Sequence, residues 1–133
     1  MKPLVLDASA LLALLFDEPG AASVEALMHR AAEKEQLMLI SAVNWAEVCY
    51  RVERKLGGGA LARAKEFATN TPVIVVPADR EMGEAAAAYK TAGLLGLADA
   101  FVAALARSRK ADLVTADREF KSVESEIKIL WLK

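Results

Sequence analysis

The stretch Leu4-Val5-Leu6-Asp7-Ala8-Ser9 is the feature from which the fold of this chain is best inferred. Three consecutive apolar residues are typical of a buried strand in a parallel sheet, which is covered on both faces. The run ends on an aspartate. A carboxylate at the end of a buried strand is costly unless it is paired, hydrogen-bonded or bound to a metal. We therefore interpret residues 4–6 as a strand that delivers Asp7 to one edge of a sheet.

Length and composition are those of one globular domain. The chain has 133 residues, within the common domain size of roughly 100 to 150, and we expect residues 1–133 to form a single domain. The 17 Lys and Arg nearly balance the 18 Asp and Glu, so bulk charge does not indicate a nucleic-acid partner. Hydrophobic residues make up 55% of the chain, a high share for a small domain. We therefore expect that part of the apolar surface is buried against a partner.

Cysteine usage and the first apolar run both bear on the compartment. A single cysteine, Cys49, excludes an intramolecular disulfide framework and is typical of a reducing compartment. The apolar run of residues 4–16 is interrupted by Asp7 and closed by polar residues at 17–20. It is also shorter than the roughly 18 to 20 apolar residues that a membrane span needs. We expect a cytoplasmic protein without a membrane segment.

Short apolar runs alternate with helical patterns along the rest of the chain. Ser41 is a natural N-cap, and the glycines at 57–59 are expected to end the helix that Ser41 begins. This alternation predicts a three-layer α/β/α sandwich with a parallel sheet of about five strands. Further strands are expected at 37–40, 73–76, 113–115 and 127–132, and helices at 10–16, around 24–32, and at 41–56, 61–68, 79–92 and 97–107, with a single turn at 118–120.

Four acidic residues are expected at the same edge of this sheet, where sites form in parallel folds. Asp7 and Asp117 follow strands, and Glu47 lies in the second turn of a helix that begins directly after a strand. Asp99 lies in the first turn of a helix that must start at this edge. Separately, these residues have ordinary explanations: a helix-end acid, a helix cap, or an exposed i,i+4 pair of Glu47 with Arg51. A metal site explains all four together.

The ligand types indicate the chemistry of such a site. Carboxylates without sulfur or imidazole favour a hard cation, Mg²⁺ or Mn²⁺, over zinc. Because no serine, cysteine or histidine nucleophile accompanies them, the pattern indicates metal-activated water attacking a phosphodiester. Thr115 and Ser9 supply hydroxyl groups that can hold a ligand or water in place.

Four motifs in this order carry a family resemblance over nearly the whole chain. They are Leu-Val-Leu-Asp-Ala-Ser at 4–9, Ser-Ala-Val-Asn-Trp-Ala-Glu-Val at 41–48, Leu-Ala-Asp-Ala-Phe-Val-Ala-Ala at 97–104 and Leu-Val-Thr-Ala-Asp-Arg-Glu-Phe at 113–120. The chain resembles PIN-domain proteins and, in size and motif order, the VapC ribonuclease toxins of toxin–antitoxin pairs.

The resemblance implies specific roles. Asp7, Glu47, Asp99 and Asp117 would be the acidic metal-site positions, with Thr115 as the catalytic-site hydroxyl beside the last, and the first strand would lie next to the fourth. The activity implied is that of a Mg²⁺-dependent endoribonuclease, the toxin of a type II toxin–antitoxin system that cleaves structured RNA. A VapB-like antitoxin and a homodimer are the implied partners. One departure is Gly96, which stands where a hydroxyl residue often caps the helix; glycine is an acceptable cap.

Two questions remain open at this level. Arg51, Arg54 and Lys55 follow Glu47 on its helix and are candidates for phosphate contacts, although they fit a solvated surface equally well. The competing functions are a PIN-like module that binds RNA or protein without nuclease activity, and a phosphotransfer domain of the dehalogenase or receiver type. The intact acids argue against the first. The second would want another acid near Asp7, at Ser9 in the dehalogenase pattern, and this chain has none there.

Overall fold

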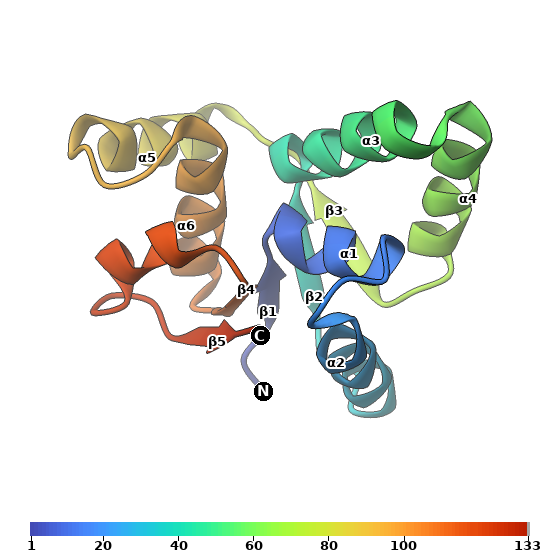
Figure 1. The fold of residues 1–133 in the computed structure, drawn as a ribbon. Helices are drawn as coiled ribbons and strands as arrows, with labels where there is room; N and C mark the ends of the chain where they lie inside the picture. The colour runs from blue at the N-terminus through green and yellow to red at the C-terminus, as the bar shows by residue number, and fades with distance from the viewer. Residues whose placement is uncertain (133) are drawn as a thin grey trace.

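A computed structural model describes residues 1–132 and shows a five-stranded parallel sheet between helices (Figure 1). The strand order is β3-β2-β1-β4-β5, so β1 lies between β2 and β4 as the resemblance implies. This arrangement confirms the predicted α/β/α sandwich. The strands are β1 (Leu4–Leu6), β2 (Met38–Ser41), β3 (Val73–Val76), β4 (Asp112–Thr115) and β5 (Ile129–Trp131).

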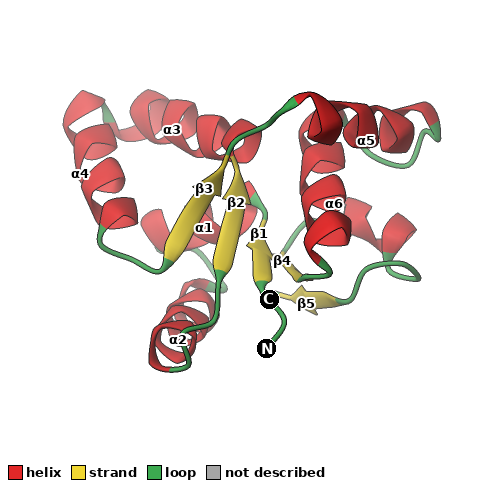
Figure 2. Cartoon of the chain, turned by 180° about the vertical axis from the view of Figure 1, so that it is seen from behind, coloured by secondary structure: helices red, strands yellow, loops and turns green. Residues whose placement is uncertain are grey.

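Helices cover both faces of the sheet, as Figure 2 shows from behind. The first four helices pack into one apolar cluster with β1 and β2, and the later helices pack into a second cluster on the other face. The helices of the first cluster are α1 (Ala8–Leu15), α2 (Ala21–Glu33), α3 (Ala42–Leu56) and α4 (Gly58–Thr69). Those of the second are α5 (Arg80–Thr91), α6 (Leu97–Arg109) and the short 3₁₀ helix η1 (Arg118–Val123).

The alternation of side chains along β1 divides the core between these two faces. Leu4 and Leu6 belong to the first cluster, whereas Val5 belongs to the second, because successive side chains of a strand point to opposite faces. All three are buried. Burying each such side chain stabilises the fold by roughly 1.5 to 3 kcal/mol. A charged residue in place of Val5 would therefore destabilise the packing of α6 against the sheet.

The boundaries differ from the sequence-based expectation in a few places. Only Gly57 ends α3, with φ +89° and ψ 174°, a conformation that side chains rarely adopt, while Gly58 and Gly59 lie inside α4. The turn expected at 118–120 is the longer η1, and β5 is shorter than residues 127–132. Strand β3 is at the edge of the sheet, and Ile74 and Val75 are 46% and 38% exposed.

Within residues 1–132, no helix has both the length and the apolar character needed to cross a membrane.

Candidate metal centre

The site begins with Asp7, which directly follows β1 and is the N-cap of α1. Its side chain is 4% exposed and accepts three hydrogen bonds. The backbone N–H of Ala8 donates to Oδ1 over 2.8 Å, and the hydroxyls of Ser9 and Thr115 donate to Oδ2 over 2.8 and 2.9 Å. Thr115 is far from Asp7 in the sequence, but the pairing of β4 with β1 brings its hydroxyl to the Asp7 carboxylate.

The two hydroxyls also connect Asp7 to the loop after β4. Thr115 is fully buried, and its Oγ1 accepts from the backbone N–H of Asp117 over 2.9 Å. Ser9 Oγ accepts from the backbone N–H of Ala116 over 3.2 Å. Each hydroxyl thus donates to Asp7 and accepts from this loop, so the orientation of Asp7 is coupled to the position of Asp117.

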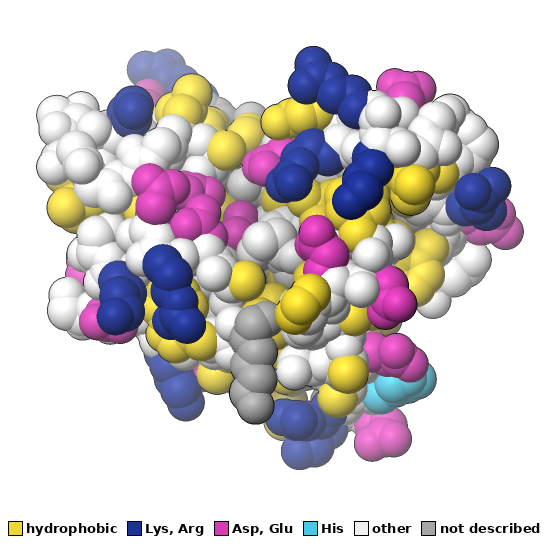
Figure 3. Space-filling view, in the orientation of Figure 1, with side chains coloured by type: hydrophobic (Ala, Val, Ile, Leu, Met, Phe, Trp, Pro, Cys, Tyr) yellow, Lys and Arg dark blue, Asp and Glu magenta, His cyan; other side chains and the backbone are white. Residues whose placement is uncertain are grey.

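Asp7, Asp99 and Asp117 come together at the carboxyl edge of the sheet. One carboxylate oxygen of each lies within 4.8 Å of the others, although the residues come from the junction between β1 and α1, from α6 and from the loop after β4. Acidic side chains gather on this face, as Figure 3 shows. Asp117 also caps η1, accepting from the backbone N–H of Glu119 over 3.0 Å.

The electrostatics of this group are those of carboxylates that repel one another. Burial raises the pKa of Asp7, against the effect of its three hydrogen bonds, and the charge of Asp117 raises it further. Burial, then the charges of Asp7 and Asp117, raise the pKa of Asp99 to about 8, and hydrogen bonds with the side chains of Asp117 and Glu119 add to the effect. Asp99 therefore retains a proton at neutral pH in the absence of a cation.

Glu47 lies beside these three aspartates but is not one of the group that meets within 4.8 Å. Burial and the charge of Asp7 raise the pKa of the Glu47 carboxyl, whereas Arg51 lowers it. The Arg51 Nη1 atom is 3.6 Å from Glu47 Oε2. The i,i+4 pair of Glu47 with Arg51 thus forms, while the charge of Asp7 still affects the pKa of Glu47. The structure brings three of the four predicted acids into one group and leaves the fourth at its margin.

Sequence reasoning missed Asn44, a buried residue that joins the two helices carrying Glu47 and Asp99. Asn44 is 0% exposed; its Oδ1 accepts from Ser41 Oγ over 2.6 Å, and its Nδ2 donates to the carbonyl of Ala98 over 3.1 Å. The first turn of α3 is thereby tied to the first turn of α6. A polar residue three positions after a predicted N-cap is a weak signal for this role, because it looks like an ordinary helix start.

Glu119 is a second omission, since its side chain contributes to the raised pKa of Asp99. The signal was its position two residues after Asp117 in the last motif.

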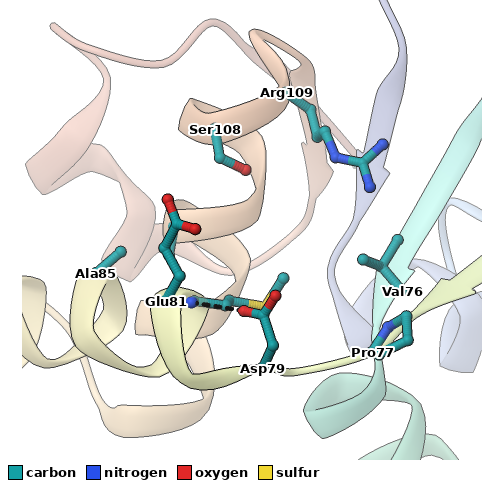
Figure 4. A pocket seen from close by; sticks show the side chains of 9 residues that line it. Val76, Pro77, Asp79, Glu81, Ala85, Ser108 and Arg109 are labelled. Atoms are coloured by element: carbon teal, nitrogen blue, oxygen red, sulfur yellow. Dashed lines mark hydrogen bonds between the residues drawn. The ribbon is translucent and has the colours of Figure 1, made fainter.

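A pocket elsewhere in the fold is separate from these acids. It has a volume of about 290 Å³ and lies between the start of α5 and the last part of α6, with Val76 and Arg109 among its lining residues (Figure 4). One of its two acidic side chains, that of Asp79, is the N-cap of α5 and accepts from the backbone N–H of Met82 over 2.9 Å. This pocket is lined by none of the predicted site residues.

The carboxylate group fits a hard divalent cation. Its ligands are all oxygen, which Mg²⁺ and Mn²⁺ prefer, and hydroxyl and backbone groups already orient Asp7. Raised pKa values mark carboxylates whose mutual repulsion a cation would relieve. Asp7, Asp99 and Asp117 are the residues that can hold it.

The fold and this carboxyl-edge acidic group define a class of α/β proteins, and sequence comparison assigns the family. Residues 4–126 match the PIN domain model, so the chain belongs to the PIN domain family. No curated protein sequence matches the chain significantly.

Solved structures share the fold over almost the whole chain. VapBC2 from Rickettsia felis, bound to a DNA fragment from its promoter, is 20% identical with a TM-score of 0.76, and 98% of each chain is covered. DNA-bound VapBC from Salmonella typhimurium is 24% identical with a TM-score of 0.75, again over 98% of each chain. VapC20 from Mycobacterium tuberculosis, a Sarcin-Ricin loop cleaving toxin, is 20% identical with a TM-score of 0.72, covering 90% of this chain and 94% of that one.

Proposed function

We propose that this chain is a metal-dependent endoribonuclease, the toxin of a type II toxin–antitoxin system, and that residues 1–133 form its single domain. The observation that carries the proposal is the meeting of Asp7, Asp99 and Asp117 within 4.8 Å, from three distant segments, at the edge where parallel sheets form their sites. Burial and the neighbouring negative charges raise the pKa values of Asp7 and Asp99, and holding such charges together destabilises the folded chain. A bound cation would offset this repulsion between the carboxylates.

The residues of the chain have distinct roles in this proposal. Mg²⁺ or Mn²⁺ held by Asp7, Asp99 and Asp117 would supply an activated water and neutralise charge on the leaving oxygen. Thr115 and Ser9 fix the direction in which Asp7 presents its oxygens. Asp99 must release its proton to bind the cation, because its pKa is about 8 when no cation offsets the neighbouring charges. Glu47, restrained by Arg51, would orient a water at the margin of the group.

The proposed partners are structured RNA, a VapB-like antitoxin and a second copy of the chain. The antitoxin is supported by neighbours of the same fold that were solved as toxin–antitoxin complexes, including VapBC from Salmonella typhimurium and FitAcB from Neisseria gonorrhoeae. The RNA substrate is supported by the Sarcin-Ricin loop cleaving toxin of the same fold. Exposed Ile74 and Val75 on the edge strand support a homodimer. Cytoplasmic localisation is supported by the single, free cysteine.

The test is cleavage of a structured RNA by purified chain with Mg²⁺, with Mn²⁺ and with EDTA. Asp7→Asn should abolish cleavage and relieve growth arrest on expression, because it removes one charge from the cation site while keeping the shape of the side chain. Asp17→Asn, which changes an exposed aspartate outside the site, is the matched control. Equal cleavage by the parent chain and Asp7→Asn in a clean preparation would contradict the proposal. RNA binding without metal-dependent cleavage would favour the alternative of a binding module.

A further inference from the structure

The exposed flank of α3 next to Glu47 carries a group of cations packed on aromatic rings. We call this group the α3 ledge; it consists of Tyr50, Arg51, Arg54 and Lys55 of α3, together with Phe16 at the end of α1. With Glu18, these residues line a hollow of about 410 Å³. Figure 3 shows Lys and Arg side chains over apolar ones next to the acidic face. The ledge therefore adjoins the candidate metal centre.

Helix geometry places the ledge cations in a row that starts at the acidic group. Arg51 lies one turn beyond Glu47 and contacts it at 3.6 Å. Arg54 and Lys55 follow about one turn further, and each turn advances about 5.4 Å along the axis. A chain of phosphates that left the metal centre along α3 would thus meet one cation at Arg51 and then a pair.

Two of the ledge cations, Arg54 and Lys55, are held in place by rings rather than by acids. Lys55 Nζ lies 4.3 Å from the centre of the Phe16 ring, and Arg54 Cζ lies 5.1 Å from that of Tyr50. Within residues 1–132, neither Arg54 nor Lys55 forms an ion pair. Their charges are therefore fixed in position but not neutralised by a carboxylate contact. Tyr50 remains 49% exposed, so ring surface is left for a base to stack on.

We propose that the α3 ledge binds the single-stranded RNA segment next to the cleaved bond, with Arg54 and Lys55 on two phosphates and Tyr50 under a base. This inference rests on the proposed ribonuclease function. An acidic centre repels a polyanion, and a row of cations beginning beside it offsets that repulsion and sets the direction of the strand. Aromatic rings interleaved with cations suit a nucleotide chain better than an acidic peptide, because each base offers a face for stacking.

The test is binding of a fluorescein-labelled single-stranded RNA of about 12 nucleotides, a length within known site sizes. Anisotropy is measured in the Asp7→Asn background with EDTA, so that no cleavage occurs. Arg54→Gln/Lys55→Gln should weaken binding about 10- to 25-fold at 0.1 M salt and make the slope of log K against log salt less negative by about 1.4. Arg30→Gln/Lys34→Gln, an equal change of charge on exposed residues at the C-terminal end of α2, should change neither.

Two further variants separate charge from stacking. Tyr50→Ser should weaken binding while leaving the salt slope unchanged, and Arg54→Lys should retain most of the affinity. Unchanged RNA binding by Arg54→Gln/Lys55→Gln would overturn the inference. Loss of affinity for a poly-glutamate peptide but not for RNA would also overturn it, in favour of a protein partner. Because metal-dependent cleavage by the otherwise unaltered chain is measured separately, either result would leave the proposed function standing, whereas absence of cleavage would refute that function itself.

Discussion

Asp99→Asn should stabilise the chain when no divalent cation is present. Asp99 has a pKa of about 8 in the folded chain, against an ordinary value of 3.8, because of burial and the charges of Asp7 and Asp117. Between these two values the folded state binds more protons than the unfolded state, so the free energy of unfolding falls as pH rises, and it levels off above pH 8. An asparagine at this position has no charge to repel its neighbours and can donate a hydrogen bond to Asp117.

The magnitude follows from the same shift. Each pH unit between the two pKa values corresponds to about 1.4 kcal/mol, which sets an upper limit of about 4 kcal/mol at pH 7. Asp99 is only partly buried, and screening by solvent reduces the expected gain to about 1 to 2 kcal/mol. For a chain of this size the melting temperature should rise by about 3 to 8 °C.

The assay is thermal unfolding in EDTA at pH 5, 6.5 and 8, followed by circular dichroism. The gap between Asp99→Asn and the parent chain should widen as pH rises. Glu81→Gln is the matched control, since Glu81 is an exposed acid in the first turn of α5, and its loss should cost no more than about 0.3 to 1 kcal/mol. A melting temperature for Asp99→Asn that is at or below that of the parent at pH 8, or a gap that does not depend on pH, would refute the reasoning.

Three further predictions concern the site and its frame. The affinity of the parent chain for Mg²⁺, measured by calorimetry, should rise up to about tenfold per pH unit between pH 6 and 8 because Asp99 must lose its proton, and Asp99→Asn should remove most of this dependence. Asn44→Asp keeps the acceptor for Ser41 but loses the donor to the Ala98 carbonyl, so urea unfolding should show a loss of about 1 to 3 kcal/mol; an unchanged midpoint would contradict the role of this bond. Gly57→Ala should destabilise by about 1 to 3 kcal/mol in the same assay, whereas Gly58→Ala, in a helix with space around its Cβ, should stabilise by about 0.5 to 1 kcal/mol.

Local patterns were sufficient for the architecture. The bounds of β1 and β3 match the apolar runs from which they were predicted, and Ser41 is the N-cap of α3 as expected. Short strands that alternate with helices admit few topologies, because parallel strands need right-handed crossovers. This constraint is why the sequence alone predicts that Asp7, Glu47, Asp99 and Asp117 lie at one edge of the sheet.

The end of α3 shows where local patterns were insufficient. Three consecutive glycines look equivalent in the sequence, yet only Gly57 adopts a positive φ, and the next two begin α4. Glycine permits both conformations, so the choice depends on where the packing of α4 requires the chain to turn. The exposure of Ile74 and Val75 likewise depends on β3 being at the edge, which the pattern of one strand does not reveal.

By itself, the sequence determined the sandwich architecture and the edge of the sheet at which the acidic residues lie, because the periodicity of apolar residues acts through neighbouring positions and parallel strands admit few connections. Only the tertiary structure decided which acids meet. It placed Thr115 within 2.9 Å of a carboxylate 108 positions away, tied Asn44 to Ala98, added Glu119 and left Glu47 at the margin. Those distances depend on how whole helices pack against the sheet, to within a few tenths of an ångström, and no short stretch of sequence encodes that packing.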